Sequence, residues 1–147
     1  MGTDIDMFIE YTDESRVAAH HNTRAGEPRW HEDWLYSIRF RAEKDYNFIA
    51  AVAGERINSE HECLIKPRGW PAQVSRGAWE YSEDFDFQHK PCRQGWLHPS
   101  EVHQCLEHQG SSPDQLSFET QSMMLMLDHL CARLGDAHVR LLFNLVG

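Results

Sequence analysis

Three acidic side chains near the start of the chain could do chemistry. Asp4, Asp6 and Glu10 are separated by even numbers of residues, and side chains at such spacings point to the same side of a β-strand. Carboxylates in a row can bind Mg²⁺, or divide into a general acid and a general base when their charges push their pKa values apart. The same spacing is also expected of the solvated outer face of a strand, so both interpretations stand.

Histidine and cysteine residues form a second candidate site. His61 and Cys63 make one pair, and His89 and Cys92 make another. Together they could close a tetrahedral Zn²⁺ site, although the gap between His61 and Cys63 is shorter than is usual in zinc fingers. The alternative is a set of thiols and histidines with unrelated roles. A Cys–His nucleophile at Cys92 or Cys105 is less favoured, because no strand-turn-helix elbow surrounds either cysteine.

Arg68 is the remaining candidate for chemistry. It precedes Gly69 in a stretch that lacks the spacing of a phosphate-binding loop. Such an arginine could contact an anion, but an Arg-Gly pair more often only turns the chain. The candidate catalytic residues are therefore Asp4, Asp6, His89 and Arg68.

Aromatic and acidic residues alternate in the middle of the chain, where they could form a recognition surface. Trp and Tyr are common interface anchors, and the neighbouring acids would steer a basic partner. The alternative is a lid, in which the rings fold back on the sheet and enlarge the core. The candidate partner-binding residues are Trp70, Trp79, Tyr81, Glu83, Asp84 and Phe85.

Strands are expected at both ends of the chain, because apolar and polar residues alternate there with the period of a half-buried strand. The alternating runs cover residues 4–11, 34–41 and 139–145. We expect the first and last strands to share one sheet, with the last strand in a central position, and the first two strands to form a meander.

Capping residues mark the helices between these strands. Asp45 and Gly54 bound a helix over residues 46–53, and His98 and Pro99 open one that runs through His108. Ser112 is expected to cap a longer helix. Its inward row is Leu116, Thr120, Met123, Leu127, Leu130 and Leu134. Residues 57–87 are expected to be an irregular connection. The pattern predicts a single α+β domain over residues 1–147, with a small, mostly antiparallel sheet and helices packed on one face.

Composition excludes several classes of protein. The chain has 147 residues, of which 41% are hydrophobic, and its formal net charge is −9. An acidic protein is repelled by nucleic-acid phosphates and by anionic lipid, so we expect no direct nucleic-acid partner. The longest apolar run, residues 48–53, is far shorter than the roughly 20 residues that span a bilayer. Without an apolar leader or a dense set of cysteines, we expect a cytoplasmic protein with reduced thiols.

Several short motifs resemble an uncharacterised family of small phage and bacterial proteins. They are Met1-Gly2-Thr3-Asp4-Ile5-Asp6, Arg41 with Asp45-Tyr46-Asn47-Phe48-Ile49-Ala50, Pro67-Arg68-Gly69-Trp70-Pro71 and Trp96-Leu97, and they span about the first two thirds of the chain. Members of that family open with Met-Gly-x-Asp-Ile-His and carry a central Arg-Gly-Leu-Pro. Asp6 and Trp70 stand here where the family has His and Leu. The resemblance implies a phage-associated origin and no particular reaction.

These observations favour a protein that acts by binding another protein, with a basic surface as the expected partner. The alternative is a metal-dependent, hydrolase-like enzyme that uses Asp4, Asp6 and His89, with Zn²⁺ or Mg²⁺ as its cofactor.

Overall fold

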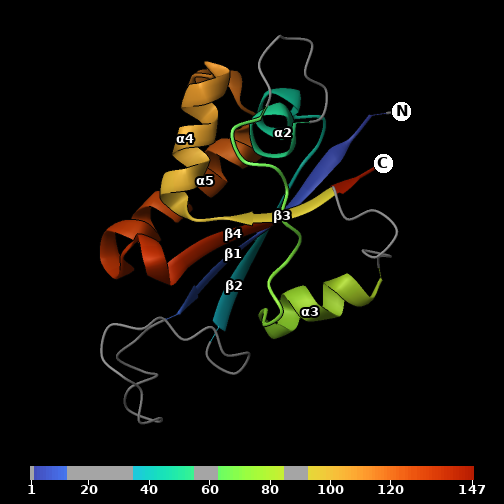
Figure 1. Cartoon of the computed structure of the whole chain (residues 1–147), viewed down its shortest axis with the longest axis vertical. Coiled ribbons are helices and arrows are strands. Elements are labelled where there is room, and N and C mark those ends of the chain that lie inside the picture. The colour runs from blue at the N-terminus through green and yellow to red at the C-terminus, as the bar shows by residue number, and fades with distance from the viewer. Residues whose placement is uncertain (1, 13–34, 55–62, 85–92) are drawn as a thin grey trace.

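A four-stranded antiparallel sheet forms the centre of the structure (Figure 1). The computed structural model describes residues 2–12, 35–54, 63–84 and 93–147. The strands, in their order across the sheet, are β2 (Leu35–Ala42), β1 (Asp4–Thr12), β4 (Val139–Val146) and β3 (Gln94–Leu97). The predicted α+β class is confirmed, as is a sheet that contains both the first and the last strand. The last strand is central, and β1 pairs with β2 as a meander requires.

The register of β1 and β4 divides the sheet into two different faces. Residues that lie opposite each other in an antiparallel pair share a face. On one face Met7 lies opposite Phe143, and both are apolar. On the other face Asp6 lies opposite Asn144, and Glu10 lies opposite Arg140. One face is therefore a hydrophobic surface and the other a mixed polar surface.

The apolar face is covered by the helices α2 (Tyr46–Ala53), α4 (Pro99–Gln109) and α5 (Phe118–Leu134), which lie on one side of the sheet in Figure 1. Their buried residues and those of the strands form one continuous core. Leu127 on the inward row of α5 is fully buried. Because none of the helices within the described ranges is both long and apolar enough to cross a membrane, the structure contains no candidate membrane span there.

The capping residues predicted from the sequence are confirmed for α2, whereas the N-cap predicted for α5 is wrong. Asp45 accepts a hydrogen bond from the Phe48 amide, and Gly54 ends α2 with a φ of 73°. Ser112 was expected to cap the long helix, but it precedes only the short 3₁₀ helix η3 (Pro113–Gln115). The prediction is wrong because Leu116 is extended and breaks the helix, so that Ser117 caps α5 instead. A second 3₁₀ helix, η4 (Asp136–His138), leads into β4.

The polar face is covered by α3 (Arg76–Glu83), which lies across the sheet from the other helices (Figure 1). The expectation of an irregular segment over residues 57–87 is wrong here, because Ser75 caps α3 by accepting a hydrogen bond from the Ala78 amide. Gly77 in the first turn lowers the helix propensity of this segment, so the sequence alone does not indicate a helix. Residues buried between α3 and the sheet form a second, smaller core. They are Phe8, Val74, Ala78, Tyr81 and Leu142.

Strand β3 was also missed by the sequence argument. It has only four residues, and a glycine normally weakens a strand. Gly95 is required here by close packing, because a Cβ atom at this position would collide with the ring of Phe143 on β4. The reason for a glycine in this strand is therefore the packing of β4 and cannot be seen in the sequence of β3 itself.

A buried ion pair lies under the start of α3. The Arg140 guanidinium contacts Glu10 through Nη2 at 2.8 Å and Nε at 2.9 Å. The Ser75 amide donates to the other oxygen of Glu10, and the Gln73 carbonyl accepts from Arg140 at 2.6 Å. Burial lowers the pKa of Arg140, and the attraction of Glu10 opposes that shift. The pair therefore joins two central strands to the segment that precedes α3.

We predict that Leu127→Ala lowers the free energy of unfolding by about 2–5 kcal/mol, the range for removing a large buried side chain. The matched control is Leu125→Ala on the same helix, where the side chain is 74% exposed and the expected change is within about 0.5 kcal/mol. Urea denaturation measures both variants. Equal losses in the two would show that the inward face of α5 is misassigned.

We predict that Glu10→Gln lowers the free energy of unfolding by about 3–5 kcal/mol, because it leaves the Arg140 charge buried without its counter-ion. Asp4→Asn is the control, since Asp4 lies on the same face of β1 but is partly exposed and should contribute less than about 1 kcal/mol. Thermal denaturation by circular dichroism compares the two. A Glu10→Gln variant as stable as the native chain would contradict the structural role of this pair.

Candidate functional site

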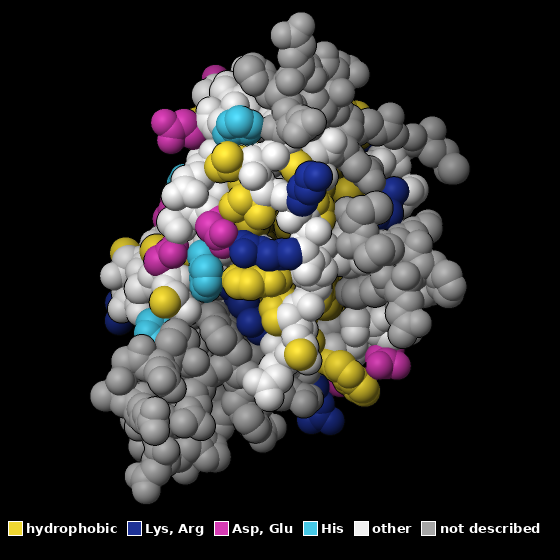
Figure 2. Space-filling model, in the orientation of Figure 1, with side chains coloured by type: hydrophobic (Ala, Val, Ile, Leu, Met, Phe, Trp, Pro, Cys, Tyr) yellow, Lys and Arg dark blue, Asp and Glu magenta, His cyan; other side chains and the backbone are white. Residues whose placement is uncertain are grey.

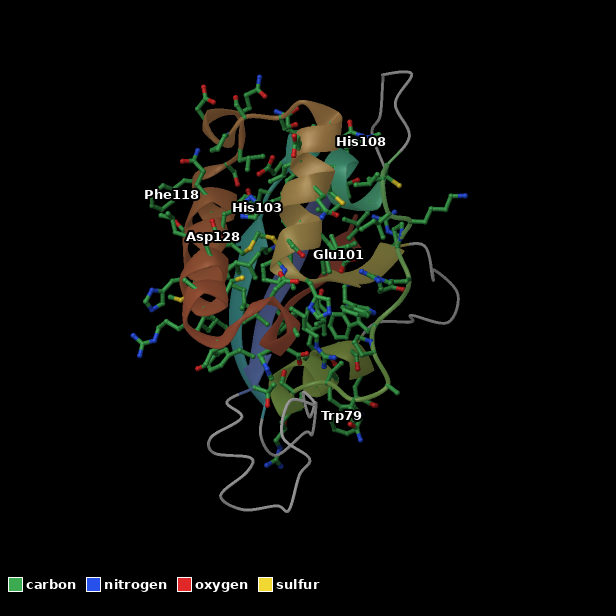
Figure 3. All side chains as sticks on the ribbon, turned by 60° about the vertical axis from the view of Figure 1, so that its left-hand side comes forward. Trp79, Glu101, His103, His108, Phe118 and Asp128 are labelled. Atoms are coloured by element: carbon green, nitrogen blue, oxygen red, sulfur yellow. The ribbon has the colours of Figure 1, made fainter. Side chains whose placement is uncertain are left out.

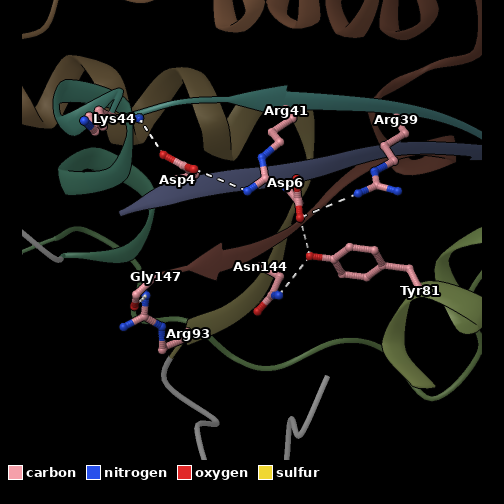
Figure 4. Close-up of polar contacts among 9 residues, drawn as sticks. All are labelled: Asp4, Asp6, Arg39, Arg41, Lys44, Tyr81, Arg93, Asn144 and Gly147. Carbon is pink, nitrogen blue, oxygen red and sulfur yellow. Dashed lines mark hydrogen bonds and ion pairs between the residues drawn. The ribbon is translucent and has the colours of Figure 1, made fainter. Parts of the chain in front are cut away.

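The polar face of the sheet holds a chain of hydrogen bonds that links four elements, and Figure 4 shows its Asp6, Tyr81 and Asn144 members. The Tyr81 hydroxyl on α3 donates to Asp6 Oδ2 on β1 at 2.5 Å. Asn144 Nδ2 on β4 donates to the Tyr81 oxygen at 3.0 Å, and Gln94 Nε2 on β3 donates to Asn144 Oδ1 at 2.9 Å. All four residues are buried. A buried polar network of this kind is stable only while its partners remain in place.

Two arginines from β2 approach Asp6 from the outer side. Arg39 Nη2 lies 3.7 Å from Asp6 Oδ2, and its guanidinium stands 4.9 Å from the centre of the Tyr81 ring. Arg41 Nη1 lies 3.8 Å from Asp6 Oδ1, and Arg41 Nη2 lies 3.3 Å from Asp4 Oδ2. Asp6 Oδ1 itself has no hydrogen bond, so its charge is balanced by the arginines at longer range.

Burial raises the pKa of Tyr81 well above its ordinary value, and donation of its proton to Asp6 adds to that rise. The hydrogen bond from Asn144 acts in the opposite direction. Tyr81 is therefore held as a neutral phenol that donates to a carboxylate. This arrangement suits a structural contact and does not suit a general base.

The acidic row predicted from the sequence is present on one face of β1, but its members have different partners. Glu10 pairs with Arg140, whereas Asp4 and Asp6 face Arg41. The alternative of a solvated outer face is wrong for Asp6 and Glu10, whose side chains are fully buried because α3 and its preceding segment cover them. The described residues include no group of three or more His, Cys, Asp or Glu side chains placed to hold a metal ion.

The His–Cys site is only partly within the described residues. Cys63 is a free, half-buried thiol, while His61, His89 and Cys92 lie outside the described ranges. The zinc site with these four ligands therefore stays a prediction. Burial raises the pKa of the Cys105 thiol to about 11, which agrees with the expectation that Cys105 is inert.

Arg68 holds the outer edge of β3. Its Nε donates to the Trp96 carbonyl at 3.0 Å, its guanidinium lies 4.1 Å from the centre of the Trp96 ring, and its Nη2 contacts Glu101 Oε1 at 2.5 Å. The Gly69 amide donates to the Gln94 carbonyl at 3.0 Å, so this segment covers part of the strand edge. Figure 2 shows hydrophobic side chains gathered near the centre of this side of the molecule, with charged side chains beside them. Arg68 is therefore engaged within the fold.

The acidic aromatic segment separates into a buried part and an exposed part. Trp70 donates through Nε1 to the Phe143 carbonyl at 2.9 Å and stacks on Tyr81, so these two residues act as the predicted lid. Trp79 is 51% exposed on α3, and Glu83 and Asp84 are exposed beside it. Phe85 lies outside the described residues. Of the predicted recognition surface, Trp79 is thus the aromatic residue that the structure places in solvent.

A groove of about 250 Å³ lies between α4 and α5. Most of its lining is apolar. The apolar lining residues are Leu106, Pro113, Leu116, Met124 and Leu125. At its edge His103 Nε2 on α4 contacts Asp128 Oδ1 on α5 at 2.6 Å, and Figure 3 shows these two side chains between the two helices.

Two large apolar side chains of α5 stand in solvent, and one of them also lines this groove. Phe118 is 78% exposed and Leu125 is 74% exposed on α5. They are seven residues apart, which places them on one face of the helix, two turns from each other. Leu125 also lines the groove. Leu125 therefore joins the exposed side chains of α5 to the groove in a mostly apolar surface, in which the polar Gln121 lies between Phe118 and Leu125. We call it the α4–α5 face, and define it by Phe118, Leu125, Leu106, Pro113, Leu116 and Met124.

The α4–α5 face was not among the candidate sites expected from the sequence. From the sequence, a role was expected only for the inward row of the long helix. The available signal was Phe118 and Leu125, two large apolar residues that lie off that row. The groove needs a partner helix, and no local pattern predicts how α4 packs beside α5.

We predict that Tyr81→Phe lowers the free energy of unfolding by about 1–3 kcal/mol, because it leaves Asp6 and Asn144 without their shared partner. Since the pKa of Tyr81 is raised in the folded state, its stabilising contribution is present below the unfolded pKa and is lost as pH rises. The difference in the free energy of unfolding between the native chain and the variant should therefore decrease above about pH 10. Urea denaturation across alkaline pH measures it. Trp79→Phe, on the same helix but exposed, should change stability little, and an equal loss there would contradict the network.

The described geometry thus contains a buried polar network, which ties the sheet to α3, and an exposed apolar surface on α4 and α5. The first is buried and joined by hydrogen bonds within the fold, and the second presents apolar side chains to solvent in the part of the chain that the structure describes. No protein-family model, curated protein or solved structure matches this chain.

Proposed function

We propose that this protein acts by binding another protein through the α4–α5 face. The observation that carries the proposal is the exposure of Phe118 and Leu125 on one face of α5, where Leu125 also lines an apolar groove. Single exposed apolar residues are common on protein surfaces, whereas a contiguous apolar surface marks an interaction site. Covering these side chains would remove them from water, and that is the main driving force of protein association.

The shape of this face also suits a protein ligand. The groove lies between two helices that both contribute to the main core, so its walls are rigid. Rigid apolar pockets surrounded by polar residues are where binding energy concentrates in protein interfaces. Leu125 belongs both to the groove and to the exposed side chains of α5. It is therefore the residue we expect to contribute most to binding.

Other candidate surfaces have less support. The α3 surface expected from the sequence retains Trp79, but Trp70 and Tyr81 are used within the fold. The metal-dependent enzyme that would use Asp4, Asp6 and His89 has no observation in its favour, because Asp4 and Asp6 face Arg41 and His89 lies outside the described residues. Protein binding is the function that the exposed geometry favours.

We predict that Phe118→Ser and Leu125→Ser reduce capture of a partner from a bacterial lysate by about 30-fold or more in affinity, the effect of losing a hot-spot residue worth about 2 kcal/mol. Tagged native and variant chains would be compared by pull-down with quantitative mass spectrometry. Trp79→Ser is the matched control, because it also removes a large exposed side chain, but on α3.

Both helix-α5 variants should retain the circular dichroism spectrum and melting temperature of the native chain, since neither side chain is in the core. Unchanged capture by folded Phe118→Ser and Leu125→Ser would refute the proposal. Loss of capture only in Trp79→Ser would instead move the binding site to α3.

A further inference from the structure

We infer that the partner places an amphipathic α-helix with Lys and Arg on its polar side against the α4–α5 face, an inference that rests on the proposed function. Two independent features of the face carry it. The first is the spacing of its apolar side chains, and the second is the charge of the helices that bear them.

Two exposed apolar side chains of the face are separated by a helical spacing. Phe118 and Leu125 are separated by seven residues along α5, which is about 10 Å along the helix axis. A helix laid alongside α5 would present anchors at the same interval, and amphipathic helices bind apolar grooves through residues at i, i+3 or i+4, and i+7. One such anchor would enter the groove between Leu106 and Leu125.

The helices around the groove are strongly acidic. Between Pro99 and Leu134 the chain has five acidic residues, a single Arg and no Lys. The acidic residues are Glu101, Glu107, Asp114, Glu119 and Asp128. Glu107, Asp114, Glu119 and Asp128 are exposed, and Glu101 is engaged by Arg68. A partner with Lys and Arg beside its apolar anchors would therefore meet an excess of negative charge on the helices that bear this face.

Asp128 places a negative charge at the groove itself. Its carboxylate lines the groove itself, next to Leu125, and contacts His103 across the groove at 2.6 Å. A Lys or Arg one turn from an apolar anchor of the partner would reach this carboxylate.

The negative charge of these helices disfavours two other occupants of the face. A second copy of this chain would bring two acidic faces together, and an anionic membrane surface would be repelled.

The test uses the full chain, labelled with ¹⁵N, and three synthetic peptides of about 18 residues, long enough to form a helix on binding. The first peptide carries Leu at i, i+3, i+4 and i+7 positions with Lys on the polar side. The second has Glu in place of every Lys. The third has the composition of the first in scrambled order, so that it cannot form an apolar stripe.

We expect the first peptide to shift the amide signals of α4 and α5, and the Glu and scrambled peptides to bind at least about tenfold more weakly, because each lacks one of the two features. Asp128→Asn should weaken the first peptide about two- to fivefold, the effect of one exposed ion pair. Glu83→Gln on α3 removes an equal charge away from the groove and should leave the affinity unchanged.

Several outcomes would overturn the inference. They are the absence of shifts with the first peptide up to about 1 mM, equal binding of the Glu or scrambled peptide, and self-association of the native chain that Leu125→Ser abolishes. If the peptides fail while Leu125→Ser still loses its captured partner, the protein-binding function stands and the helical, basic partner is wrong. If capture is also insensitive to Leu125→Ser, both proposals fail.

Discussion

The ion pair between Glu10 and Arg140 is the constraint on which the rest of the structure depends. A carboxylate and a guanidinium on neighbouring central strands are costly to bury unless their remaining hydrogen-bonding groups are satisfied. The Ser75 amide and the Gln73 carbonyl supply those partners, so the chain must pass over this face of the sheet just before α3. The position of α3 follows from that requirement, and Tyr81 of α3 forms the lid together with Trp70.

The two faces of the sheet are consequently stabilised by different kinds of contact. The apolar face packs against α2, α4 and α5 by hydrophobic contact, which is tolerant of small adjustments. The polar face is held by directional contacts, in which Tyr81, Asp6 and Asn144 each need the others. Because α5 is apolar on its buried side and also at Phe118 and Leu125, the hydrophobic layer does not end at the protein surface. The proposed binding surface is an outward continuation of the core.

Polar and charged residues from distant parts of the chain engage one another outside the main core. Asp4 and Asp6 contact Arg41, and Arg68 contacts Trp96 at the edge of β3. These residues are far apart in the chain but engage one another, so their types are explained by the fold they hold together. These positions stabilise the architecture, and they are distinct from the residues of the proposed binding surface on α4 and α5.

The sequence by itself determined β1, α2, α4 and β4, because strand alternation and helix caps such as Asp45 act between residues that are close along the chain. It also placed Asp4, Asp6 and Glu10 on one face. Only the tertiary structure decided what those side chains meet, since the partner of Glu10 is 130 residues away. The same holds for the site: Phe118 and Leu125 are visible in the sequence as apolar residues off the inward row, but the groove beside them exists only because α4 packs next to α5. Short-range sequence patterns determine the helices and strands, because they depend on residues close along the chain. The surfaces of the protein depend on how those helices and strands pack against one another.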